Sequence, residues 1–375
     1  KTNGVTPILS VGDLPPNGYR FEAIPDGISF VGGRHGDDDN GHGSKGKGGE
    51  ILINHELSLV PFPAARQDPS NSIVGRISLH GDAEVVKSSI AIPSSAGYQR
   101  FCSNFAVGRE HGFDRQLLFT NEEARDIVLR QEDSWHTGGV ALSEPGAEQA
   151  GVVVAYDVKK KTYKSIYGMG RHNHENSVAL PGYRRPVILS GDDTFDAPAS
   201  QLYMYTAKSG RHVWKDKGKL YAFVSDNPAI NDYGDVSVGM TVPGHFIEVP
   251  REIATGKDAD DGSEITSADF GYPTPAAAVP PTAAMPDGPQ WVLEHWSNLN
   301  NVFQFIRIED TAYDRKNPRI MYMADTGEPR GTPVVEANFS INDPTIGSDG
   351  TIYGTTAFGG SPVTMRDRAP SPEQC

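Results

Sequence analysis

The sequence has few cysteines, no long apolar run and a deficit of positive charge, and each shortage excludes a class of protein. With only two cysteines, Cys102 and Cys375, the chain has no framework of disulfides. No apolar stretch reaches roughly 18 residues, which excludes a membrane-spanning helix. Lysine and arginine number 34 against 48 acidic residues, and the net charge of −14 argues against a nucleic acid as partner. That charge is compatible with bound cations and equally with a solvated acidic surface.

Long helical periodicity is also scarce, and short β-rich runs separated by turn residues take its place. Three pairs of runs predict adjacent antiparallel strands, 152–157 with 161–167, 202–205 with 220–224, and 320–323 with 324–327. Short strands at this spacing, without helices between them, predict an all-β fold and favour a β-propeller over a sandwich. The predicted strands are 49–54, 116–120, 152–157, 186–190, 201–205, 219–224, 290–295, 302–308, 319–323 and 351–355.

The chain is predicted to form a single propeller domain over residues 1–375. Two segments, 32–49 and 250–286, are expected to be loop excursions because Gly and charged residues dominate the first and Pro, Ala and Asp the second. The sequence starts at Lys1 rather than Met, which favours a processed N-terminus and hence a secreted or periplasmic protein.

The segment 168–176 carries a high density of polar side chains between two β-like runs. Its charged or titratable members are Arg171, His172, His174 and Glu175. Carboxylates bind hard cations and arginine binds oxyanions, so a metal or anion site is one interpretation. A hydrogen-bonded polar turn is the other, and the residues alone leave both open. The two histidines could equally serve to orient neighbouring carboxylates.

Several predicted strands end directly in acidic residues. These strand-end acids are Glu56, Glu122, Glu123, Asp192, Asp193, Glu309 and Asp310. In a propeller the innermost strands line a central channel, so acids placed at the ends of successive strands would converge at one mouth. Ordinary acidic turns explain any single case, but the repetition favours a cation site.

A series of motifs in fixed order resembles the PhoX-type alkaline phosphatases, a family of calcium- and iron-dependent propeller phosphatases. The resemblance covers roughly residues 50–360 and rests on the order and spacing of the motifs rather than on any one of them. The motifs are Asn54-His55-Glu56, Phe101-Cys102-Ser103-Asn104, Leu117 to Glu123, Gly170 to Glu175, Ser190-Gly191-Asp192-Asp193, Leu202 to Tyr205, Arg307 to Asp310, Asp314 to Pro318 and Ile320 to Tyr322.

The resemblance implies a propeller of about six blades with a multinuclear metal cluster at its central mouth. It places Cys102, Glu175 and Glu309 on iron ligands. Calcium-associated positions fall on Glu123, Asp193, Glu122 and Asp192. We add Glu56, the early strand-end acid, as a further candidate metal ligand. Arg307 falls on a phosphate-binding arginine, and Arg171 is a second candidate clamp.

The implied reaction is hydrolysis of a phosphoric monoester by a metal-activated oxygen nucleophile, with Ca²⁺ and Fe³⁺ as cofactors. The chain departs from the family pattern at two places. Ser103-Asn104-Phe105 replaces the small residues that follow the family's cysteine, and the distal acidic pair is missing where 341–344 reads Ile-Asn-Asp-Pro. These departures bear on the full iron–calcium cluster more than on the fold.

Two other functions suit a calcium-binding propeller. A lactonase or sugar lyase would use one Ca²⁺ to polarise its substrate, with His172 or His174 moving a proton. A noncatalytic propeller would use Ca²⁺ for stability and bind a protein or glycan. In the enzymatic cases the partner is an anionic small molecule or a glycan. Cys102 is either a metal ligand, a buried small side chain or a disulfide partner of Cys375.

Overall fold

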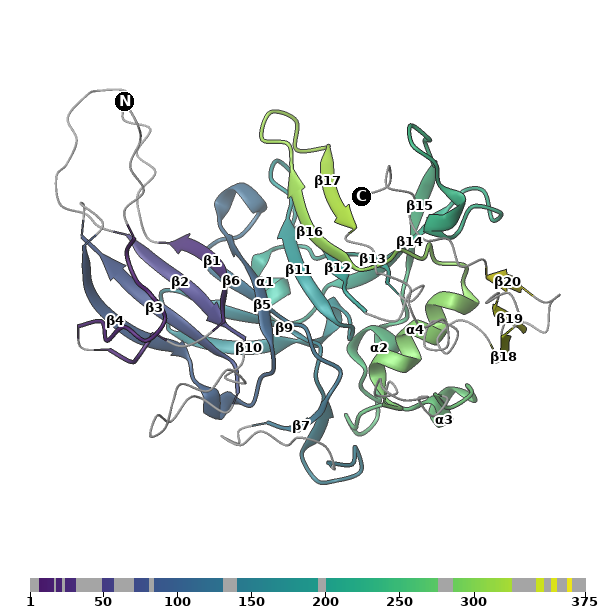
Figure 1. Ribbon diagram of the computed structural model, residues 1–375, viewed down its shortest axis with the longest axis horizontal. Helices are drawn as coiled ribbons and strands as arrows, with labels where there is room; N and C mark the ends of the chain where they lie inside the picture. The colour runs from purple at the N-terminus through teal and green to yellow at the C-terminus, as the bar shows by residue number, and fades with distance from the viewer. Residues whose placement is uncertain are drawn as a thin grey trace.

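The fold is mostly antiparallel β-sheet, which confirms the predicted all-β class (Figure 1). The computed structural model describes residues 7–16, 18–21, 24–31, 49–56, 71–80, 84–130, 140–194, 200–275 and 286–325, with three strands between 342 and 365. No closed barrel or closed ring of sheets is found among these residues. None of the helices in this part of the chain is long and apolar enough to cross a bilayer.

Each of the three larger sheets is built mainly from strands that follow one another along the chain. The first sheet contains β1 (Pro25–Val31), β2 (Glu50–His55), β3 (Ile73–Leu79) and β4 (Val85–Ile92). The second contains β5 (Phe101–Val107), β6 (Leu117–Glu122), β9 (Val153–Asp157) and β10 (Thr162–Ile166). The third contains β11 (His174–Ala179), β12 (Val187–Asp192), β13 (Leu202–Thr206), β14 (Lys219–Ser225) and β15 (Gly244–Glu248).

Three smaller sheets complete the described strands. One pairs β16 (Ile308–Tyr313) with β17 (Met321–Asp325), and another pairs β7 (Ile127–Leu129) with β8 (Ala147–Gln149). The last contains β18 (Asn342–Ile346), β19 (Ile352–Thr355) and β20 (Val363–Met365).

The first strands of four successive sheets lie side by side in chain order. Strand β1 contacts β5, β5 contacts β11, and β11 contacts β16, as Figure 1 shows for the last pair. In each sheet the first residue of the first strand pairs with the last residue of the second strand, and the register then shifts. These four pairs are Pro25 with His55, Phe101 with Glu122, His174 with Asp192, and Ile308 with Asp325. The same irregularity is therefore present at the same end of all four sheets. A bulge of this kind re-aims the side chains beside it.

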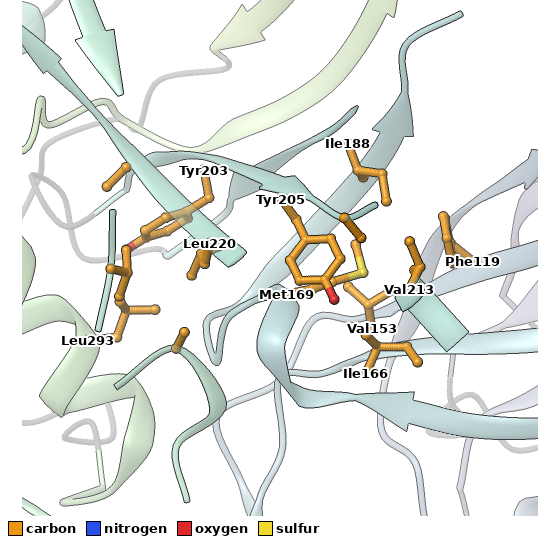
Figure 2. Packing of buried hydrophobic residues seen from close by; sticks show 14 of the residues in the cluster. Phe119, Val153, Ile166, Met169, Ile188, Tyr203, Tyr205, Val213, Leu220 and Leu293 are labelled. Carbon is orange, nitrogen blue, oxygen red and sulfur yellow. The ribbon is translucent and has the colours of Figure 1, made fainter. Parts of the chain in front are cut away.

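The largest core packs the third sheet against the second sheet and against helix α4 (Pro289–Leu299), as seen in Figure 2. Phe119 and Val153 enter it from the second sheet, Tyr205 and Leu220 from the third, and Leu293 from α4. Strand β9 is buried along its whole length, as expected of a continuous apolar run rather than an alternating one.

Eight of the ten predicted strands coincide with or overlap observed strands, and two of the three predicted pairs are confirmed as β9–β10 and β13–β14. The third pair, 320–323 with 324–327, is wrong, because residues 321–325 form the single strand β17, which pairs with β16. The pair β13–β14 holds helix α1 (Gly210–Trp214) in its connection. The strand expected over 290–295 is wrong, because this segment lies in α4. Pro289 suits the first turn of that helix, and Leu293 and Trp296 then face the core together. The run 302–308 forms only isolated bridges before β16 begins at Ile308.

The segment 250–286 is more than a loop excursion where the structure describes it. It contains α2 (Arg251–Thr255) and α3 (Ser267–Phe270), and it buries Ile253, Ala254 and Ile265 in the largest core. Residues 276–285 lie outside the described chain, as do residues 32–48 of the other predicted excursion.

Candidate metal centre

Seven candidate ligands come from two repeated positions in the sheets. One position is the second residue of the first strand, inside the register shift: Asp26, Cys102, Glu175 and Glu309. The other position is the residue directly after the second strand: Glu56, Glu123 and Asp193. Because the first strands lie side by side, both positions gather at one end of the sheets.

Backbone hydrogen bonds hold the second position in the same way in three sheets. The amide of the strand-end acid donates to the carbonyl of the residue that precedes the first strand. These bonds run from Glu56 to Ile24 at 3.2 Å, from Glu123 to Arg100 at 3.0 Å, and from Asp193 to Asn173 at 2.9 Å. The repetition shows that the acids are placed by the backbone and do not reach the cluster by chance.

Two glycines allow the close approach of neighbouring sheets at this end. A Cβ on Gly27 would lie 2.4 Å from the backbone nitrogen of Asn104, so β1 can pass this close to β5 only with glycine there. A Cβ on Gly191 would lie 2.6 Å from Ile308 Cγ2, which likewise keeps β12 against β16. Gly27 directly follows the candidate ligand Asp26, and Gly191 lies two residues before the candidate ligand Asp193.

Asparagine side chains also tie the sheets together beside the cluster. Asn54 Nδ2 donates to the carbonyls of Cys102 and Ser103 at 2.8 and 3.0 Å, and so links β2 to β5. Asn176 Nδ2 donates to the carbonyl of Glu309 at 3.2 Å, which links β11 to β16. Backbone groups beside a bulge lose their ladder partners, and these amides supply replacements.

The ligand atoms form three overlapping groups, and within each group the atoms lie within 4.8 Å of one another. The groups are Asp26 with Glu56 and Cys102, Cys102 with Glu123 and Glu175, and Glu175 with Asp193 and Glu309. Cys102 and Glu175 each belong to two groups, so the three groups form one row with shared members. The Cys102 thiol joins the row directly, because its Sγ lies 3.1 Å from Asp26 Oδ2 and 3.3 Å from Glu175 Oε1 and can donate its one proton to either oxygen.

The carboxylates of this row are electrostatically unfavourable without positive charge. Burial and the carboxylate of Glu123 raise the pKa of Glu175 to about 9. Burial and the carboxylate of Asp193 raise the pKa of Glu123 to about 8, and burial with Asp26 raises the pKa of Glu56 to about 7. Burial and the same carboxylates raise the pKa of the Cys102 thiol. A bound cation would reverse these shifts, because it stabilises the charged forms.

Two arginines occupy one repeated position at the edge of the row, the residue that precedes a first strand. Arg307 and Arg100 both have left-handed backbone there, with φ of 56° and 39°. The guanidinium of Arg307 donates to Asp193 at 2.9 and 3.1 Å, and it also pairs with Glu309 at 2.9 Å. The charge of Arg100 opposes part of the rise that burial causes in the pKa of Glu56 and Glu123.

Arg171, predicted as a second phosphate clamp, lies outside the row. Its side chain is fully buried and donates to both carboxylate oxygens of Glu264 at 2.9 Å, as well as to the carbonyl of Gln149. The ring of Tyr167 covers the guanidinium, whose Cζ lies 5.3 Å from the ring centroid. This arrangement fixes Arg171 as a structural ion pair between the second sheet and the segment after α2.

Glu122 and Asp192 also lie outside the three groups, although each directly precedes a member. Glu122 is buried and accepts two hydrogen bonds from Arg130, at 2.8 and 2.9 Å, and others from backbone amides. Asp192 is buried and accepts from Thr194 Oγ1 at 2.8 Å. Neighbouring residues of a strand point to opposite faces, so only one acid of each pair can face the cluster.

His172 and His174 belong to none of the three groups. Their ring centroids lie 3.5 Å apart, and His172 stacks on Tyr203 with centroids 4.7 Å apart. His174 is held by Ser190 Oγ at 2.9 Å and by the carbonyl of Gly170 at 3.1 Å. Burial lowers the pKa of His174 to about 3 and lowers the pKa of His172 as well, so both rings are neutral at pH 7. Within the described residues neither ring nitrogen of His172 has a hydrogen-bond partner.

Asp26 and Arg100 are two residues of the centre that were not predicted from the sequence. In the sequence, Asp26 lies near the start of a strand, as Cys102, Glu175 and Glu309 do. That position points to a ligand only once the common register shift is known, and the register shift is visible only in the structure. Cys102 itself is a free thiol, and its other suggested partner, Cys375, lies outside the described residues.

Comparison with known proteins finds no matching family model, no matching curated protein and no matching solved structure. The centre is therefore interpreted from its own residues. Six carboxylates and one thiol, arranged as a row of three groups with arginine at its edge, form a donor set suited to several hard cations with one softer position at Cys102.

Proposed function

We propose that this protein is a metal-dependent hydrolase of phosphoric monoesters, built on a propeller related to the PhoX-type alkaline phosphatases. The observation that carries the proposal is the row of three ligand groups, joined through Cys102 and Glu175 and flanked by Arg307. A single structural calcium does not need shared ligands, whereas adjacent metal ions that act on one substrate do.

The propeller is supported by the repeated geometry of the sheets. Four successive sheets share one register shift, and their first strands lie against each other in chain order. The pair Asn342–Thr355 shows that the sheet of β18–β20 has the same shift. Sheets arranged by their first strands around one axis are the blades of a propeller, and we infer about six blades in the whole protein.

The residues divide into two kinds of ligand. Cys102 would hold the softer metal, with iron as the best match, and Glu175 would bridge it to the group that contains Asp193 and Glu309. Asp26, Glu56 and Glu123 offer oxygen ligands only and suit Ca²⁺. When bound, the metal ions supply charge neutralisation at the phosphoryl oxygens and activation of water as a nucleophile.

Arg307 would bind the phosphate. Its side chain is 24% exposed, it lies at the edge of the last ligand group, and its guanidinium has the planar geometry that pairs with two oxygens at once. Arg171 cannot share this role while it is buried against Glu264, and Arg100 takes its place as the second arginine near the row.

The geometry gives less support to the lactonase or lyase. Those reactions require His172 or His174 to exchange a proton with substrate, yet His174 is fully buried and His172 is 3% exposed. The noncatalytic propeller remains the alternative that the test must separate.

The test combines metal analysis with an assay. Protein purified without chelator is analysed for iron and calcium, and hydrolysis of p-nitrophenyl phosphate is measured in Ca²⁺ for wild type, Glu309→Ala and a matched exposed control, Glu110→Ala. We expect iron with more than one calcium, activity in wild type and the control, and loss of both activity and metal in Glu309→Ala. One calcium without phosphatase activity would support a lactonase, and metal without any hydrolysis would support the noncatalytic propeller.

A further inference from the structure

The strand ends opposite the metal centre form a second surface feature. Strands β5, β11 and β16 carry their candidate ligands near their first residues and end in turns at the far end of the sheets, about 20 Å away for a six-residue strand. Five turns lie at this far end: 108–116, 157–161, 180–186, 207–219 and 313–320.

Contacts between the turns join all five into one continuous surface. Gly182 N donates to the carbonyl of Glu110, and Ala207 N donates to the carbonyl of Pro186. The ring of His111 lies 6.3 Å from that of Tyr313. Arg115 connects two more turns, because it pairs with Asp157 at 2.9 Å and lies 5.0 Å from the ring centroid of Trp214. We call this surface the basic face.

The basic face reverses the charge balance of the rest of the chain. Its five turns contain fifteen lysines and arginines and five acidic residues, although the whole chain has 34 and 48. The bases include Lys159, Lys160, Lys161, Arg184, Arg185, Lys208, Arg211, Lys215, Lys217, Arg315, Lys316 and Arg319, all of them exposed. Such a concentration of positive charge in an acidic protein attracts anions.

Apolar side chains are exposed among these charges. Tyr183, directly before Arg184, is 40% exposed, and Ile320, directly after Arg319, is 44% exposed. Both lie in turns rather than within a strand, so their side chains can insert into an apolar layer without any change in the sheets.

We propose that the basic face binds an anionic lipid surface, with lysine and arginine at the headgroups and Tyr183 and Ile320 in the interfacial layer. Binding in this way directs the metal centre, at the opposite strand ends, toward solvent. Two features favour a lipid surface over a linear polyanion. The charges are spread over five turns, and the exposed aromatic and aliphatic groups beside them match an interface of headgroups and acyl chains.

Sedimentation of the whole protein with vesicles tests the proposal. Vesicles of phosphatidylcholine alone are compared with an equimolar mixture of phosphatidylcholine and phosphatidylglycerol. We expect binding only to the anionic vesicles, weakened by salt. Arg184→Gln with Arg185→Gln should weaken binding about fivefold for each charge removed. Tyr183→Ser with Ile320→Ser should weaken the part of the binding that persists at high salt.

The matched control is Arg20→Gln with Arg125→Gln, which removes the same charge outside the five turns and should leave binding unchanged. Circular dichroism of each variant verifies the fold. Equal binding to neutral vesicles, or equal loss in the control pair, would overturn the proposal. Absence of vesicle binding together with tight, salt-sensitive binding to heparin would overturn it in favour of an anionic polysaccharide.

Discussion

The guanidinium of Arg307 donates two parallel hydrogen bonds to the carboxylate of Asp193, from Nε to Oδ1 at 2.9 Å and from Nη2 to Oδ2 at 3.1 Å. The same side chain pairs with Glu309. Arg307 thus neutralises two of the three carboxylates in the last ligand group and competes with any metal ion for them. A cation bound there would release the guanidinium for a phosphate, so one residue links metal binding to substrate binding.

Replacing Arg307 should separate these two effects. In Arg307→Gln we expect the rate of p-nitrophenyl phosphate hydrolysis to fall about 100-fold or more, as for loss of a donor to a developing oxyanion. The affinity for Ca²⁺, measured by isothermal titration calorimetry, should rise several-fold because the competing cation is gone. Arg319→Gln, on the basic face, is the control. A variant that loses Ca²⁺ affinity together with activity would show that Arg307 supports the ligand group and does not compete for it.

Arg100 provides a second test, because it precedes β5 with the same left-handed backbone that Arg307 has before β16. Its charge lies near Glu56 and Glu123 without the bidentate pairing seen for Arg307. In Arg100→Gln we expect KM for the phosphomonoester to rise about five- to tenfold, with kcat changed less than about twofold. The reason is that the lost charge would attract the bound substrate and the transition state equally. An unchanged KM would restrict the anion site to Arg307.

The sequence was sufficient to predict the fold class and most strands, because apolar runs bounded by turn residues have few other structures available. It failed at 290–295, where an apolar segment of six residues is compatible with a strand as well as a helix. It could identify strand-end acids but not choose between Glu122 and Glu123, because that choice depends on which face the register shift turns toward the cluster. Arg171 was assigned by its neighbours in sequence, whereas its function follows from Glu264, which is 93 residues away.

The metal-free protein should lose stability as the pH rises. The folded-state pKa values of Glu56, Glu123 and Glu175 are raised to about 7, 8 and 9, above the ordinary value of 4.5. Raised values favour the protonated folded form, so this contribution is fully present below pH 4.5 and is lost as the pH passes through 7 to 9. We expect the free energy of unfolding in chelator to fall by about 2 kcal/mol or more between pH 5 and pH 9, since one pKa unit corresponds to about 1.4 kcal/mol.

Urea unfolding at a series of pH values, in EDTA and in Ca²⁺, measures this effect. Calcium should flatten the dependence, because the cation stabilises the ionised carboxylates. In EDTA, Glu175→Gln should remove the part of the pH dependence that lies near pH 9, because the group with the highest pKa is gone. Parallel curves in EDTA and Ca²⁺ would show that these carboxylates do not bind the ion.

Arg171→Met should destabilise the protein without altering the chemistry of the folded fraction. Among the described residues, the change leaves the buried Glu264 with Lys257 as its one cation partner, and breaking a buried pair of this kind costs about 3–5 kcal/mol. Urea unfolding gives the loss of stability, and metal content per folded molecule should equal that of wild type. Arg211→Met, an exposed arginine on the basic face, is the control. Retained stability with lost phosphatase activity would instead return Arg171 to the phosphate site.

Asp26→Asn should lower the calcium content of protein purified without chelator by about one ion. Asp26 belongs to the group that contains Glu56 and Cys102, and removing one charged ligand weakens a hard-cation site more than it perturbs the fold. Atomic emission spectroscopy gives the metal content, and circular dichroism verifies the fold. If Asp26→Asn keeps full calcium, the first sheet contributes no ligand, and the cluster is completed by the sheets that follow it.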